Sequence, residues 1–162
     1  MRGINSKKLL MVSSALFLTM NFSTSFAQTV IVNGADENII VDPVATPAIK
    51  FLTNDSAIVD DSVTITGTII TENNGEGILT FLGDSSVSNT IGNINDKLGQ
   101  INANGGMGTV VTFNGNVYAD IINNNGDSTL HFNKIVGGNI NLGSSLNSSI
   151  ALDDNVNVDG NV

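Results

Sequence analysis

The chain has 162 residues, no Cys, no Trp and a single His, and its 15 acidic and 6 basic residues give a formal charge of −9. The lack of Cys excludes disulfide frameworks, thiol nucleophiles and Cys-based zinc sites, and a single His excludes a His-cluster metal site. The acidic balance argues against nucleic acid as a partner, because phosphate binding needs clustered Lys and Arg. Asn is unusually frequent, with 24 positions. Polarity that comes from Asn, Ser and Thr, together with 17 Gly, is typical of β structure with many turns.

The N-terminus has the features of a secretory signal peptide. Residues 1–8 carry three basic side chains, an apolar run follows from Leu9 to Met20, and small residues precede the end of the segment. This pattern predicts a signal peptide over residues 1–27, cleaved between Ala27 and Gln28. A bilayer span needs about 20 apolar residues, and no apolar run beyond residue 28 approaches that length. We therefore expect no transmembrane helix after cleavage. The exported chain keeps 15 acids and 3 bases, a formal charge of −12, and its lack of Cys is compatible with a bacterial envelope protein.

The rest of the chain repeats one strand pattern. Residues 28–48 hold both prolines and are predicted to form an extended leader, and residues 49–162 form the repeat domain. Apolar and polar residues alternate over 111–121, 130–142 and 150–162. Alternation of this length predicts strands with one buried face. The copies share apolar anchor positions that we expect in the core: Ile65, Phe81, Phe113, Phe132 and Leu152.

The spacing of these anchors favours a stack of parallel strands. Phe113 and Phe132 are 19 residues apart, and Phe132 and Leu152 are 20 apart. One copy cannot bury its apolar face alone, whereas copies stacked along an axis cover one another. We therefore predict an all-β fold, a short parallel β-solenoid. The alternative is an antiparallel β-sandwich, which would use hairpin dipeptides such as the five Asn-Gly pairs of this chain.

The frequent Asn residues have two physical uses in such a stack. Asn tolerates positive φ better than most residues and so suits the corners between strands. Asn side chains stacked in register also form hydrogen-bonded ladders, without the repulsion that stacked acids would bring.

Longer phrases within residues 50–162 identify a resemblance. GILTFLGDSSVSNTIG, GTVVTFNGNVYADIINNNGDSTLHF and GGNINLG resemble the passenger repeats of rickettsial outer-membrane surface antigens, the surface cell antigen family of autotransporters. In that family a long β-helical passenger precedes a C-terminal outer-membrane barrel. Such a barrel needs at least eight strands and aromatic girdles, and no aromatic residue follows Phe132. The resemblance therefore implies an N-terminal passenger fragment, truncated before the translocator barrel.

The same resemblance implies an exported bacterial protein of the cell surface or outer membrane, the periplasm or the extracellular space. Its expected role is structural or adhesive and without catalysis, with host-cell surface molecules or neighbouring passenger repeats as partners. Two alternatives stay open: a non-functional gene remnant, and a secreted β-helix carbohydrate-active enzyme. The enzyme is disfavoured because the exported chain offers only Lys50, Lys97 and Lys134 as bases beside its carboxylates.

Individual residues give no sign of a reaction centre. His131 lies on the polar face of a strand and reads as a surface histidine. The segment 105–108, GGMG, lacks the third spaced glycine and the helix of a nucleotide loop. The carboxylates of Asp60-Asp61 and Asp153-Asp154 point to opposite strand faces. Residues 155–160, NVNVDG, share the alternating Asn and Asp positions and the glycine of a calcium loop. They start with Asn and lack the flanking helices of such a loop. We therefore expect no catalytic residue, no cofactor and no metal.

Overall fold

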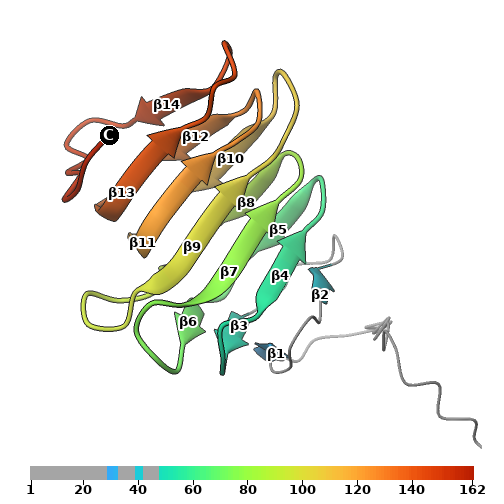
Figure 1. Cartoon of the computed structure of the whole chain (residues 1–162), viewed down its shortest axis with the longest axis vertical. Coiled ribbons are helices and arrows are strands. Elements are labelled where there is room, and N and C mark those ends of the chain that lie inside the picture. Colours follow the sequence, from blue (N-terminus) through green and yellow to red (C-terminus); the bar gives the residue numbers. More distant parts are fainter. Residues whose placement is uncertain (1–28, 33–38, 42–47) are drawn as a thin grey trace, which may run out of the picture.

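The structure, a computed structural model, describes residues 29–32, 39–41 and 48–162, and this part of the chain is a parallel β-solenoid (Figure 1). It contains fourteen strands and no helix within these ranges. Every strand pairing described is parallel, including β10 with β12 and β7 with β9. The predicted solenoid is therefore confirmed, and the antiparallel β-sandwich alternative is wrong. The predicted signal peptide and its cleavage between Ala27 and Gln28 lie outside the described residues.

Three sheets surround a common interior. The three-stranded sheet contains β1 (Thr29–Val32), β3 (Ala48–Phe51) and β6 (Ile69–Thr71). The five-stranded sheet contains, in spatial order, β5 (Val63–Ile65), β8 (Ser85–Val87), β10 (Val110–Phe113), β12 (Thr129–Phe132) and β14 (Ser149–Leu152). The six-stranded sheet contains β2 (Ile39–Val41), β4 (Ser56–Val59), β7 (Glu76–Phe81), β9 (Leu98–Ala103), β11 (Val117–Asn124) and β13 (Val136–Leu142).

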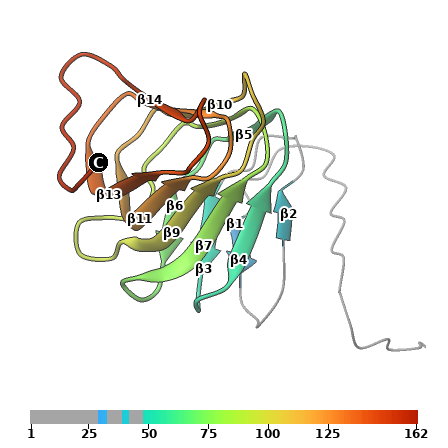
Figure 2. The same ribbon diagram turned by 45° about the horizontal axis from the view of Figure 1, so that its top comes forward.

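Each turn of the solenoid adds one strand to each of the two larger sheets. In both views β4, β7, β9, β11 and β13 lie side by side (Figure 1 and Figure 2). The side formed by the three-stranded sheet continues through single bridged residues, which pair Ile69 with Ile91 and Ile91 with Val117. The stack is thus quasi-one-dimensional, because each turn contacts mainly its two neighbours.

The segment expected to be an extended leader, residues 28–48, contains the two short strands β1 and β2 among its described residues. β1 pairs with β3, and β2 pairs with β4, both in parallel register. The inward side chain of Val32 is completely buried. The segment TVIV, residues 29–32, thus pairs with the first strand of the predicted repeat domain.

The core consists of inward side chains stacked turn upon turn. Ile65, Phe81, Phe113 and Phe132 are at most 1 % exposed. Phe113 pairs with Phe132, and their rings stack at 5.0 Å between centroids. Phe81 belongs to the six-stranded sheet, and its ring meets that of Phe113 across the interior, edge to face at 5.7 Å. The two sheets are therefore joined by an aromatic cluster, whose geometry adds about 0.5–1.5 kcal/mol per pair to burial.

Leu152 does not occupy the expected core position. It pairs with Phe132 in register, yet it is 49 % exposed. The reason is that β14 is an edge strand of the five-stranded sheet, so that its inward side chains are covered by a neighbouring turn on one side only.

Candidate functional site

The outer side of the six-stranded sheet carries a ladder of amide side chains. Thr80, Asn102, Asn123 and Asn141 occupy corresponding positions on β7, β9, β11 and β13. Asn141 Nδ2 donates to Asn123 Oδ1 at 3.0 Å, and Asn123 Nδ2 donates to Asn102 Oδ1 at 3.0 Å. Asn102 Nδ2 donates to Thr80 Oγ1 at 3.4 Å. The ladder therefore crosses four turns, as parallel in-register stacking of Asn requires.

A second row runs beside this ladder. It alternates apolar and polar side chains: Ser56, Ile78, Gln100, Ile121 and Asn139. Gln100 joins the two rows, since its Nε2 donates to Asn102 Oδ1 at 2.6 Å. Ile121 is 39 % exposed. We name the two rows, Ser56 to Asn139 and Ile58 to Asn141, the amide face.

The amide face is uncharged. None of the side chains in its two rows is acidic or basic, although the whole chain carries a formal charge of −9. Acidic residues begin at its margins: Asp60 follows β4, Glu76 begins β7, and Asp120 lies at the irregularity of β11. The sheet thus presents a polar surface without charge, bordered by carboxylates.

The ladder leaves hydrogen-bonding groups free to face outward. Each carboxamide has two N–H donors and two acceptor lone pairs. Asn123 uses one N–H toward Asn102 and one oxygen lone pair toward Asn141. Within the described residues, its second N–H and its second lone pair make no side-chain bond of this ladder. Asn141 likewise donates once and retains its second N–H and its oxygen.

Other Asn residues pair in the same way elsewhere on the stack. Asn133 Nδ2 donates to Asn114 Oδ1 at 2.8 Å just beyond β10 and β12. Asn125 Nδ2 donates to Asn104 Oδ1 at 3.3 Å just beyond β9 and β11. These pairs confirm the expectation that Asn forms ladders between turns.

At the corners, Asn acts mainly through its side-chain oxygen rather than through positive φ. Asn54 Oδ1 accepts from the Gly77 amide, and Asn74 Oδ1 accepts from the Lys97 amide. Among the described residues other than Gly, only Ser62 and Asn155 have positive φ. The expected use of Asn in left-handed corners is therefore wrong for nearly all of them, because an oxygen that caps the next turn's amide satisfies a donor that the corner leaves unpaired.

One Asn lies inside the stack, which the sequence pattern did not reveal. Asn124 and Ser128 are both completely buried. Asn124 Nδ2 donates to the carbonyls of Ser128 at 2.7 Å and Ser149 at 3.2 Å, and Ser128 Oγ donates to Asn124 Oδ1 at 2.7 Å. A buried amide is tolerated here because its polar groups are hydrogen-bonded.

Asp61 and Asp84 each accept a hydrogen bond from a backbone amide of the next turn. Asp61 Oδ1 accepts from the Asp84 amide at 2.8 Å, and Asp84 Oδ1 accepts from the Val110 amide at 2.7 Å. These two carboxylates cap corners of successive turns. Asp84 also lines a shallow surface hollow together with Ser62, Val63, Thr64, Ser85 and Ser86.

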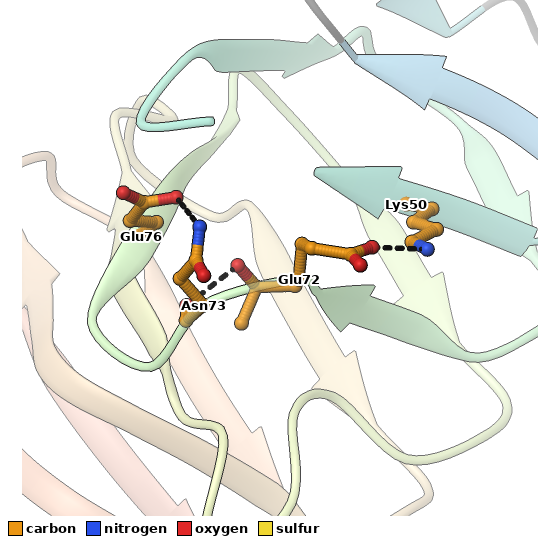
Figure 3. A network of polar contacts seen from close by, with 5 residues as sticks. Lys50, Glu72, Asn73 and Glu76 are labelled. Carbon is orange, nitrogen blue, oxygen red and sulfur yellow. Dashed lines mark hydrogen bonds and ion pairs between the residues drawn. The ribbon is translucent and has the colours of Figure 1, made fainter. Parts of the chain in front are cut away.

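The ionic contacts lie at the surface. His131 Nε2 is 2.8 Å from Asp153 Oδ1, and both side chains are partly exposed. Lys50 pairs with Glu72, and Asn73 Nδ2 donates to Glu76 Oε2 at 2.9 Å in the corner that follows β6 (Figure 3). Such exposed pairs contribute about 0–1 kcal/mol each.

The two other segments considered in the sequence, residues 105–108 and 155–160, lie outside the named strands. Residues 105–108 form part of the connection between β9 and β10, and residues 155–160 follow β14. The described residues contain no group of three or more His, Cys, Asp or Glu side chains arranged to hold a metal ion.

Comparisons with known proteins add no relative: no family model, no curated protein and no solved structure matches the chain. Within the described residues, no helix is long and apolar enough to span a membrane.

Proposed function

We propose that the chain is an exported bacterial cell-surface protein, similar to an autotransporter passenger, that acts as a structural and adhesive interaction module without catalysis. The observation that supports this most directly is the amide face, where Asn102, Asn123 and Asn141 align across successive turns. A regular uncharged surface on a rigid stack supplies many equivalent weak contacts, which is the arrangement that gains from multivalent binding.

Two sequence features support export. Residues 1–27 have the composition of a secretory signal peptide. The phrases GILTFLGDSSVSNTIG and GGNINLG resemble surface-antigen passenger repeats, and a parallel solenoid is compatible with that resemblance. Host-cell surface molecules or neighbouring passenger repeats are the partners that the proposal implies.

Surface display is tested on intact cells of the producing bacterium. Cells are treated with an external protease and then blotted with an antibody against the chain, with a periplasmic protein blotted in parallel. We expect the chain to be degraded while the periplasmic protein survives. Protection of the full amount of the chain would contradict surface display.

Adhesion is tested separately with beads coated with the purified chain. We expect these beads to adhere to host cells more often than beads coated with an equally acidic protein of unrelated fold. Equal adherence of the two kinds of bead would contradict the adhesive role and leave display as a separate result.

A further inference from the structure

We infer that the amide face binds an uncharged linear glycan that lies across the strands, along the two rows. This inference deepens the proposed adhesive function and rests on it. The ligand class follows from three properties of the face: its repeat, its lack of charge and its mixture of amide and apolar side chains.

The repeat of the face matches a linear polymer. Thr80, Asn102, Asn123 and Asn141 recur once per turn in register. Neighbouring strands lie about 4.8 Å apart, so that the four side chains span about 14 Å. Sugar rings in an extended chain recur at a similar interval and present hydroxyl groups at each repeat. A sugar hydroxyl can therefore accept from the second N–H of Asn102, Asn123 or Asn141, and at Asn123 and Asn141 it can also donate to the amide oxygen.

The charge of the face selects a neutral ligand. No acidic or basic side chain lies in the two rows, and carboxylates such as Asp60 and Asp120 border them. An anionic glycan would bring its charges close to these carboxylates and to a chain with a formal charge of −9. A neutral glycan avoids this repulsion.

The apolar members of the face fit the other surface of a sugar. Ile78 and Ile121 flank Gln100 in one row, and Ile121 is 39 % exposed. Sugar rings carry C–H groups on their faces and hydroxyls on their edges. Alternation of isoleucine with amide along the row therefore offers apolar contact and hydrogen bonds at successive turns.

The size of the face argues against a second copy of the chain. The outer side of five strands of about six residues, which includes the amide face, covers about 20 Å by 24 Å, or about 500 Å². A stable protein interface buries about 800 Å² on each partner. A narrow linear ligand needs less area and gains affinity by contacting several turns at once.

The test measures glycan binding by the full chain with ligand-observed NMR. The neutral probes are hexamers of glucose and of N-acetylglucosamine, and the anionic probe is a heparin hexamer. We expect binding of at least one neutral hexamer and none of heparin. The variants Asn123→Leu and Ile121→Ser should each weaken neutral binding about tenfold, as the loss of one or two contacts predicts.

Two matched variants control for effects on folding. Asn114→Leu removes an amide–amide bond of the same kind that lies just beyond the five-stranded sheet, away from the amide face. Ile135→Ser removes a side chain of similar exposure, 41 %, that lies outside the amide face. Both should bind the neutral glycan as the unchanged protein does.

Several outcomes would overturn the inference. These are no binding of either neutral hexamer at millimolar concentration, equal losses in the control variants, or preference for heparin. A second copy or a protein bound at this face in place of glycan would also contradict it. Surface display without glycan binding would refute the ligand class and leave the proposed function intact, whereas glycan binding by a chain that is not displayed would refute the proposed function alone.

Discussion

Individual Asn side chains make different kinds of hydrogen bond, depending on their position in a turn. Asn123 joins the ladder outside the six-stranded sheet, Asn74 caps a corner amide, and Asn124 is buried with its amide bonded to two backbone carbonyls. The side chain is the same, and its surroundings decide its role. An uncharged amide suits all three places because it both donates and accepts.

The buried Asn124 gives a test at the residue scale. The Asn124 amide donates to the carbonyl oxygens of Ser128 and Ser149. In Asn124→Asp a buried carboxylate replaces this donor, and it cannot donate to either oxygen. We expect the free energy of unfolding to fall by about 3 kcal/mol or more, measured by urea denaturation.

The neighbouring residue supplies the control for this variant. Asn125 is exposed and makes one long side-chain bond at 3.3 Å, so Asn125→Asp should change the free energy of unfolding by less than about 1 kcal/mol. Equal losses in the two variants would show that burial is not the cause.

At the scale of the element, the pairing of β11 with β13 depends on a glycine. The register shifts between Tyr118 and Ile121 of β11, and a Cβ added at Gly138 would lie 1.8 Å from the Ala119 carbonyl oxygen. Between Tyr118 and Ile121, β11 has one residue more than the paired segment of β13. Such a bulge bends the strand that contains it and increases its local twist. The close approach of the two backbones there leaves no room for any side chain.

Gly138→Ala should therefore force β13 away from β11. We expect a loss of about 2 kcal/mol or more in the free energy of unfolding, measured by thermal or urea denaturation. Gly106→Ala is the control, because nothing lies within 4 Å of a Cβ added at Gly106. An equal change in the free energy of unfolding for the two variants would contradict the idea that the close approach of Gly138 to Ala119 limits stability.

The amide ladder gives a second test at the element scale. Asn102→Asp and Asn123→Asp together place like charges on directly paired positions of β9 and β11. We expect the double variant to lose up to about 1 kcal/mol beyond the sum of the single variants at low salt, and less at high salt. Strictly additive, salt-independent losses would contradict the idea that the ladder needs uncharged side chains.

At the scale of the whole molecule, the stack is covered unevenly along its axis. Phe132 is completely buried between β10 and β14, whereas Leu152 of the edge strand β14 is 49 % exposed. Stability in a stack of turns is approximately a sum of terms for each turn and for its neighbours. The edge should therefore open more easily than the middle.

Substitutions along one column of the core test this gradient. Phe132→Ala should lower the free energy of unfolding by about 3–5 kcal/mol, and Leu152→Ala by about 1 kcal/mol. Hydrogen exchange should be fastest in β14 and slowest in β9 to β11. Uniform protection from β9 to β14 would contradict a turn-by-turn distribution of stability.

The sequence predicted the parallel stack because alternation is a local property. Val111 and Phe113, or Leu130 and Phe132, can bury a common face only against another such strand, and the spacing of 19 residues places Phe113 directly on Phe132. The outer Asn positions follow from the same alternation. The amide rows were therefore foreseeable in kind from the sequence.

What only the tertiary structure decided is which strands share a sheet. Phe81 and Phe113 look equivalent in the sequence, but Phe81 pairs with Ala103 in the six-stranded sheet and Phe113 with Val87 in the five-stranded sheet. The burial of Asn124 and the exposure of Leu152 were hidden for the same reason. Alternation sets which way a side chain points, whereas the corners, whose lengths vary, set which strand it meets.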